Sequence, residues 1–137
     1  MFFTKLGAPT RFDASRGTLF SYIGNTNIFE CPTDRAHSGD SYASNAQLSR
    51  TTETKGFHEG ISATTLTAPS ATFLFLEESA PAAADSTNDS YFDPRNDRAS
   101  NRHRGGSNMA FCDGHVVWLK PLELKYPDPS GRSRFEP

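Results

Sequence analysis

An Asp-Gly pair between two apolar runs constrains the fold of this chain more than any other sequence feature. Asp113-Gly114 separates Asn108–Cys112 from His115–Leu119, and Asp-Gly is a preferred pair for the two-residue type I′ turn of a β-hairpin. Such a turn places the following residues opposite each other: Cys112 and His115, Phe111 and Val116, and Met109 and Trp118. Because both faces of this hairpin are largely apolar, we expect it to lie inside a sheet that is covered on each side.

Three further segments carry secondary-structure signals. Thr72–Glu77 is apolar at four consecutive positions, which predicts a central strand beside the hairpin. Arg16–Ile23 places apolar residues on one helical face and ends at Gly24, so it predicts a short helix. Asn27–Cys31 alternates between polar and apolar residues and predicts a short strand.

The composition of the chain predicts that its remaining segments are mostly loops. The 137 residues include 9 Pro and 10 Gly, and roughly 39% are apolar by a count in which typical domains reach about 45–50%. We therefore expect one domain of the α+β class: a small antiparallel β-sheet with a C-terminal hairpin, one short helix and long irregular loops. Residues 1–12 are expected to form an extended lead-in and residues 120–137 a surface tail.

Charge and hydropathy exclude some function classes. The net charge is −2, so no overall electrostatic feature favours binding to nucleic acid. Four arginines within residues 95–104 alternate with Asp93 and Asp97; the alternatives are a solvated loop with internal ion pairs and a phosphate or polyanion site. No stretch of the sequence approaches the ~20 apolar residues that a membrane-spanning helix requires.

The loop before the hairpin is rich in hard oxygen ligands, which Ca²⁺ prefers. Its candidate calcium ligands are Asp85, Asn88, Asp89, Asp93 and Asp97. Their spacing does not match an EF-hand. The alternatives are a calcium site and an ordinary solvated acidic loop, and no other cofactor is expected.

Several short motifs occur together in one order along most of the chain. They are Tyr22–Asn25 (Y-I-G-N), Phe29–Asp34 (F-E-C-P-T-D), Ser41–Asn45 (S-Y-A-S-N), Pro69-Ser70 ahead of an apolar strand that ends in Glu77-Glu78-Ser79, and His103 with nine residues between it and Asp113-Gly114. In this combination the chain resembles the prepilin-type processing-associated H-x9-DG domain. That resemblance implies a fold similar to bacterial type II secretion pseudopilins, in which part of a long N-terminal helix lies on a small antiparallel sheet. It also singles out His103, Asp113 and Gly114 as family motif residues.

The prepilin leader and its apolar anchor helix do not occur in this sequence. We therefore expect a pseudopilin-like head domain from a truncated or processed chain, or a variant without the anchor. Membrane attachment would then depend on a missing N-terminal anchor helix. The resemblance further implies a calcium-stabilised loop before the last strands, which would be the acidic loop described above.

Cys31 and Cys112 are the two cysteines of the chain. The resemblance implies a location outside the cytoplasm, where a disulfide is allowed. We expect a Cys31–Cys112 disulfide, and the alternative is two isolated buried thiols.

The motif residues have a structural and a chemical interpretation. Asp113 and Gly114 suit a turn that needs positive φ, and His103 can support the hairpin by a hydrogen bond. The alternative is a metal or acid/base cluster of His103, Asp113 and His115. No G-x-S-x-G elbow occurs, and we expect no enzyme.

The functional expectation is a structural subunit of an extracellular pilus-like filament or secretion pseudopilus. It would be extracellular or periplasmic and would assemble with copies of itself or with other pseudopilins. Phe2, Phe3 and Leu6 are the candidate self-assembly residues, because a short chain terminus has little core of its own to join. The alternative is a secreted calcium-dependent module that binds a glycan or a protein.

Overall fold

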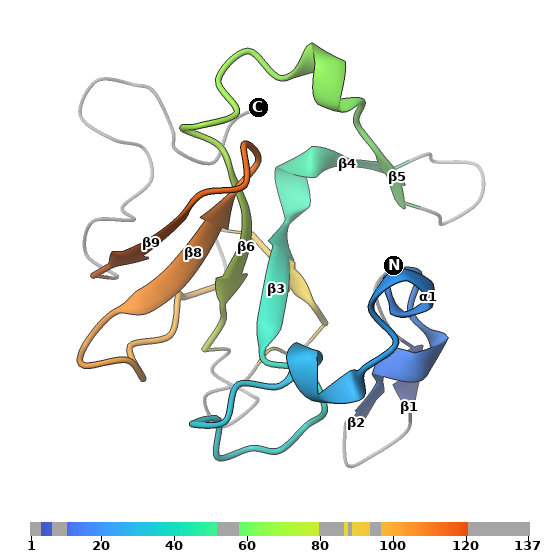
Figure 1. Cartoon of the computed structure of the whole chain (residues 1–137), viewed down its shortest axis with the longest axis vertical. Coiled ribbons are helices and arrows are strands. Elements are labelled where there is room, and N and C mark those ends of the chain that lie inside the picture. The colour runs from blue at the N-terminus through green and yellow to red at the C-terminus, as the bar shows by residue number, and fades with distance from the viewer. Residues whose placement is uncertain are drawn as a thin grey trace.

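A mixed β-sheet forms the centre of the computed structural model (Figure 1). The structure describes residues 4–6, 11–51, 58–79, 87, 89–93 and 97–120. The strands are β1 (Thr4–Leu6), β2 (Arg11–Asp13), β3 (Tyr42–Asn45), β4 (Ser49–Thr51), β5 (His58–Gly60), β6 (Phe73–Glu77), β7 (Tyr91–Phe92), β8 (Ser107–Phe111) and β9 (Val116–Leu119). The helical elements are α1 (Phe20–Ile23) and the 3₁₀ turns η1 (Ala14–Arg16), η2 (Thr26–Phe29), η3 (Ala46–Leu48) and η4 (Ala63–Thr65). The whole is a small α+β arrangement.

The central sheet has the strand order β7-β3-β6-β8-β9. Its β3–β6, β6–β8 and β8–β9 pairs are antiparallel, as expected, but β7 pairs in parallel with β3. The expectation of a wholly antiparallel sheet is therefore wrong at one edge. Although β7 follows β6 in the sequence, it pairs with the outer side of β3 and runs in the direction of β3.

The hairpin near the C-terminal end forms with a register one residue away from the predicted one. Ala110 lies opposite Val116, Met109 opposite Val117 and Asn108 opposite Trp118. Because Phe111 N–H donates to the carbonyl of His115 at 2.9 Å, the turn holds three residues, Cys112, Asp113 and Gly114, with Gly114 at φ +94°. Three-residue turns of this kind place a left-handed residue last, which suits glycine.

That one-residue difference decides which side chains enter the core, because neighbouring residues of a strand face opposite sides. Met109 and Phe111 are buried with Val117 packed against them, in a core that β6 supplies with Phe73 and Leu76. Val116 and Trp118 face the other way and are 65% and 44% exposed. The predicted cover on both faces of the hairpin is therefore wrong.

Between Asp13 and Phe29 the chain folds into short turns. The predicted helix over Arg16–Ile23 is split into η1 and α1, because Gly17 is extended at φ −79° and ψ 152°. Gly24 ends α1 in the left-handed region, as predicted. The strand predicted over Asn27–Cys31 is wrong: Asn25 accepts the N–H of Asn27 and begins η2 instead.

β3, with the sequence Tyr-Ala-Ser-Asn, lies near the middle of the sheet, in a part of the chain where composition predicts long irregular loops. Tyr42 is half-buried, whereas Ala43, Ser44 and Asn45 are buried. The buried amide of Asn45 donates to the carbonyl of Phe73 at 3.1 Å. Hydrogen bonds to neighbouring backbone therefore let polar residues occupy a central strand.

The ends of the chain differ in what the structure describes. β1 and β2 pair antiparallel, so part of the predicted lead-in is a short two-stranded sheet. Residues 121–137 of the predicted tail lie outside the described residues. Within the described part of the chain, no helix has the length and apolarity needed to cross a membrane.

Candidate functional site

His103 and Asp113-Gly114 lie at the two ends of β8. His103 and Gly106 exchange backbone hydrogen bonds, both 3.1 Å long, across a tight turn. The two residues between them have positive φ, +54° at Arg104 and +83° at Gly105, which is the geometry of a type I′ turn. His103 therefore closes the turn that leads into β8.

Trp118 of β9 links this turn to the hairpin through a hydrogen bond and a packing contact. Its indole Nε1–H donates to the carbonyl of His103 at 2.7 Å. The ring also covers Gly106, where an added Cβ would lie 2.4 Å from Trp118 Cε2. Only glycine fits beneath the indole, so His103, Gly106 and Trp118 act together as a structural support of β8 and β9.

The Asp113 end of β8 is a separate, exposed feature. The Asp113 carboxylate accepts hydrogen bonds from the backbone and the ring of His115, and these bonds lower the pKa of Asp113. The ring of His115 stacks on Phe111 with centroids 4.4 Å apart. β8 holds five residues at ~3.4 Å each, so Asp113 and His115 are too far from His103 to share an ion with it. The cluster of His103, Asp113 and His115 considered above is therefore wrong.

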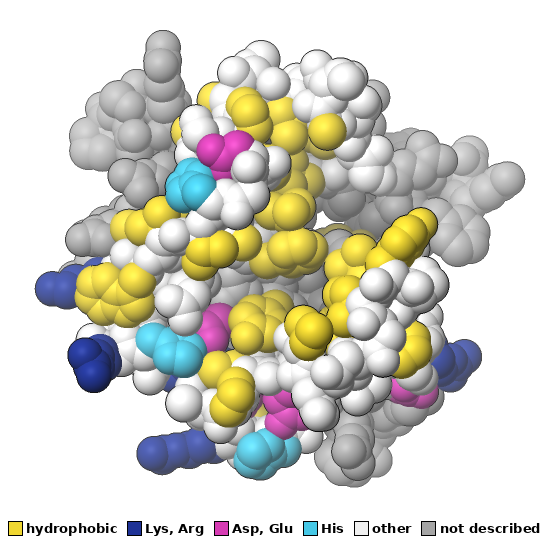
Figure 2. All heavy atoms as spheres, viewed as in Figure 1, with side chains coloured by type: hydrophobic (Ala, Val, Ile, Leu, Met, Phe, Trp, Pro, Cys, Tyr) yellow, Lys and Arg dark blue, Asp and Glu magenta, His cyan; other side chains and the backbone are white. Residues whose placement is uncertain are grey.

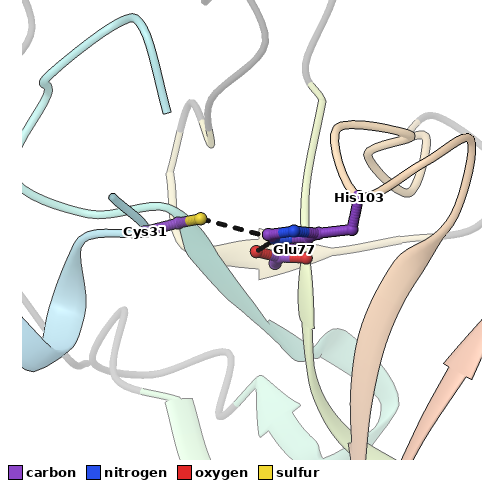
Figure 3. A group of neighbouring side chains, drawn as sticks. All are labelled: Cys31, Glu77 and His103. Carbon is purple, nitrogen blue, oxygen red and sulfur yellow. Dashed lines mark hydrogen bonds and ion pairs between the residues drawn. The ribbon is translucent and has the colours of Figure 1, made fainter. Parts of the chain in front are cut away.

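The side chain of His103 instead meets Glu77 and Cys31 (Figure 3). Its Nε2 lies 2.6 Å from Glu77 Oε1 and 3.5 Å from Cys31 Sγ. Glu77 is the last residue of β6, and Cys31 is the second residue after the end of η2. Cys31 is 2% and Glu77 1% exposed, whereas the His103 side chain is 27% exposed. Three donor atoms from distant parts of the sequence thus converge at a site that is open on the His103 side.

This geometry is not that of a nucleophilic triad. In such a triad the base uses one ring nitrogen for the nucleophile and the other for the carboxylate. Here the same nitrogen of His103 faces both Cys31 and Glu77. The three groups point toward a common centre, as ligands do, rather than forming a relay.

A buried polar network holds the cluster in place. Cys31 N–H donates to Ser41 Oγ at 2.9 Å, and the Ser41 hydroxyl donates to Asp34 at 2.6 Å. Asp34 forms an ion pair with Arg102 at 2.8 Å, and Arg102 also donates to the carbonyl of Glu78 at 2.8 Å. The network therefore links the segment of Cys31 to the ends of β6 and of the His103 turn.

Two further carboxyl groups are buried beside this network. Burial raises the pKa of Asp40 to about 8, against the opposing effect of the Ser90 hydroxyl, 2.7 Å away. Burial also raises the pKa of Glu78 to about 8, although Thr87 donates to its Oε2. Within the described residues, Glu78 Oε1 has no hydrogen-bond partner. Both groups therefore hold a proton at neutral pH more readily than ordinary carboxyl groups do.

The predicted calcium ligands are only partly described. Asp85 and Asn88 lie outside the described residues. Asp93 N–H donates to the Asp97 carboxylate at 2.7 Å, and Asp89 caps the N–H of Tyr91 at 2.9 Å. Among the residues that the structure describes, the carboxylates of Asp89, Asp93 and Asp97 do not come together as three ligand atoms within 4.8 Å.

Both cysteines are free thiols, so the predicted disulfide is absent from the structure. Cys31 lies beside the His103 turn, which precedes β8, and Cys112 directly follows β8. The length of β8 keeps the two residues farther apart than the ~7 Å between Cα atoms that a disulfide tolerates. Burial raises the pKa of the Cys112 thiol.

An apolar groove crosses the sheet face opposite the core. Figure 2 shows hydrophobic side chains gathered around a hollow on this side of the molecule. The groove has a volume of about 290 Å³. Its floor comes from the sheet (Tyr42, Phe75, Ala110 and Val116) and one wall comes from α1 and its flanking segments (Leu19, Ile23 and Ile28). Phe2 and Phe3, two predicted self-assembly residues, lie outside the described residues, and Leu6 belongs to β1.

Sequence reasoning missed the partners of His103. Cys31 and Glu77 both stand in or beside the motif stretches, but they are 46 residues apart and neither spacing nor periodicity joins them to His103. Only the pairing of β6 with β8 and the return of the chain after η2 bring them together. No family model, curated protein or solved structure matches this chain.

Proposed function

We propose that this chain is a structural subunit of an extracellular pilus-like filament or secretion pseudopilus, which acts by self-assembly and not by catalysis. The groove across the sheet is the observation that carries this proposal. Its apolar lining is continuous with the exposed side chains of Ile28 and Val116. Exposed apolar patches of this kind mark interaction surfaces in soluble proteins.

The proposed occupant of the groove is the N-terminal segment of a second copy. That segment carries Phe2, Phe3 and Leu6, and aromatic side chains bury a large apolar area for little loss of conformational entropy. A contact between one end of a copy and a groove on the next is head-to-tail. Such contacts propagate into open polymers unless the rotation closes a ring.

The resemblance to H-x9-DG domains supports the same role. It implies a subunit with an apolar segment packed on the sheet, and the groove offers apolar side chains from β3, β6, β8 and β9 for that purpose. It also implies an extracellular or periplasmic location. Because Cys31 and Cys112 are free thiols, they add no support for this location.

A charge in the groove is expected to prevent assembly. Val116→Glu places a carboxylate at a residue that is 65% exposed and lines the groove, where it would be desolvated by an apolar partner. We expect the sedimenting fraction of the purified chain to fall about tenfold or more, as measured by ultracentrifugation with electron microscopy of the pellet. Thr67→Glu adds the same charge at an exposed position outside the groove and should assemble like the unmodified chain.

Phe2→Ser with Phe3→Ser tests the other side of the contact. This double variant should also stay dispersed, and mixing it with Val116→Glu should not restore long polymers, because each keeps only one functional surface. A monomer at every concentration for the unmodified chain, or equal assembly by Val116→Glu and Thr67→Glu, would refute the proposal.

A calcium-dependent binding module is the second candidate function, and Glu78 favours it. Glu78 is fully buried with one carboxylate oxygen unpartnered among the described residues. The nearby charges of Asp97 and Asp89 help to raise its pKa. A divalent cation would neutralise this concentration of negative charge.

Calcium is expected to raise the melting temperature if this second candidate is right. Binding to the folded state alone adds stability in proportion to the logarithm of the calcium concentration. The measurement is thermal unfolding by circular dichroism in Ca²⁺, in Mg²⁺ and in chelator, with Glu78→Gln as the variant that loses the response. Equal melting temperatures in calcium and chelator would exclude the calcium module and leave the assembly proposal intact.

A further inference from the structure

We propose that Cys31, Glu77 and His103 form a binding site for Zn²⁺ or a similar divalent transition metal. One ligand atom from each residue, the thiol sulfur, a carboxylate oxygen and an imidazole nitrogen, lies within 4.8 Å of the other two. Figure 3 shows the three side chains pointing toward one another from separate segments of the chain. The site is independent of the groove and of the assembly role.

The donor set selects the class of metal. A thiolate combined with an imidazole favours zinc and its neighbours over Mg²⁺ or Ca²⁺, which prefer oxygen ligands alone. The carboxylate of Glu77 is compatible with zinc, which accepts nitrogen, sulfur and oxygen donors in a tetrahedral arrangement.

The distances fit such a site with a small adjustment. Zinc–sulfur and zinc–nitrogen bonds of about 2.3 and 2.0 Å at a tetrahedral angle place the two donors about 3.5 Å apart. Cys31 Sγ and His103 Nε2 are separated by 3.5 Å. The pair of His103 Nε2 and Glu77 Oε1, now 2.6 Å apart as a hydrogen bond, must open by several tenths of an ångström to admit the ion.

The surroundings orient two of the ligands. Glu77 Oε2 accepts the N–H of Asn108 at 3.2 Å, which leaves Oε1 directed at the centre of the cluster. Ser41 Oγ holds the backbone of Cys31. Groups that orient ligands in this way are part of how proteins tune metal sites.

Access and charge also suit a metal. Cys31 and Glu77 are buried, but the partly exposed ring of His103 gives an ion a path from solvent. On binding, the Cys31 thiol gives up its proton to solvent and His103 ligates as the tautomer that carries its proton on Nδ1, so the affinity should fall as the pH is lowered. Three protein ligands leave one coordination position for water or an outside ligand.

The test is a cobalt titration of the metal-free full chain, followed by zinc. Co²⁺ bound by a thiolate gives a near-ultraviolet charge-transfer band and visible bands, which Zn²⁺ should remove by competition. We expect saturation at one ion per chain, and a higher melting temperature for the zinc-loaded protein.

Matched variants locate the site. Cys31→Ser should abolish the charge-transfer band, and His103→Gln should weaken cobalt binding by more than about 100-fold, beyond the effect of losing a group that only orients ligands. Cys112→Ser and His115→Gln remove the same chemical groups at the other end of β8 and should bind as the unmodified chain does. Circular dichroism of each metal-free variant separates loss of the site from loss of the fold.

Two results would overturn the proposal. One is the absence of a thiolate band from the folded, reduced, unmodified chain at millimolar cobalt. The other is a band that survives Cys31→Ser or disappears with Cys112→Ser. If Cys31→Ser does not fold, Glu77→Gln in a folded chain must still weaken cobalt binding at least about tenfold, and unchanged affinity there would also refute the site. None of these readouts depends on filament formation, so this proposal and the assembly role fail separately.

Discussion

Replacing Arg102 by Met is expected to lower the free energy of unfolding by about 3–5 kcal/mol. The side chains of Arg102 and Asp34 are 8% and 0% exposed and form an ion pair of 2.8 Å. Without the guanidinium, Asp34 keeps a buried charge without its cationic partner, and the carbonyl of Glu78 loses its donor. Urea unfolding followed by circular dichroism measures this loss, which corresponds to a fall in melting temperature of roughly 10–20 °C.

The double variant Arg102→Met with Asp34→Asn separates the ion pair from packing. The introduced asparagine side chain is neutral, its one oxygen can accept the N–H of Ala36 and its amide NH₂ can donate to the Ser41 hydroxyl, so it should recover part of the lost stability. Arg98→Met is the matched control, because Arg98 is exposed. An effect of Arg102→Met within about 1 kcal/mol of the control would contradict a buried ion pair at this position.

Stability is expected to fall as the pH rises from about 4 to about 8. The pKa values of Asp40 and Glu78 are raised from 3.8 and 4.5 to about 8 in the folded protein. In that window the unfolded chain has released both protons and the folded chain still binds them. Each group therefore lowers the free energy of unfolding by at most about 1.4 kcal/mol per pH unit. Urea unfolding at several pH values measures this decrease.

Asp40→Asn and Glu78→Gln should each flatten this pH dependence. The amides keep an acceptor for Ser90 and for Thr87, and they have no proton to release. Asp13→Asn removes a carboxyl at the cap of η1 and should leave the slope as it is. A stability that is constant or rises between pH 5 and pH 8 in the unmodified chain would contradict the raised pKa values.

The sequence predicted the elements whose signals are local. The Asp-Gly pair located the hairpin of β8 and β9, four consecutive apolar residues located β6, and Gly24 located the end of α1. A turn residue with positive φ or a run of apolar side chains acts within a few positions of itself. For that reason these predictions needed no knowledge of the rest of the fold.

The register of the hairpin could not be predicted from local sequence signals. Two-residue and three-residue turns both accept Asp and Gly, and they differ by one residue in pairing. The observed register places Val117 and Leu119, rather than Val116 and Trp118, on the core face with Met109 and Phe111. The strand β3 was missed for a related reason, because the Asn45 amide and the Ser44 hydroxyl donate to carbonyls that are distant in the sequence, those of Phe73 in β6 and of Ser90 just before β7.

The candidate metal site was beyond prediction from the sequence. His103 was singled out by its motif, but the distance along the chain to Asp113 suggested a partnership that β8, lying between them, prevents. Its actual neighbours, Cys31 and Glu77, are 72 and 26 positions away. Separations of that size carry no periodic signal.

By itself, then, the amino-acid sequence determined the hairpin, the strand of β6, the turns at glycine and the prevalence of loops, because each depends on interactions between near neighbours. The tertiary structure alone decided which hairpin face is buried, that Cys31 and Cys112 lie apart, and that Cys31, Glu77 and His103 meet. These outcomes depend on strand order and register. Register is chosen by the free energy of burying one whole face of the sheet, to which all strands contribute at once.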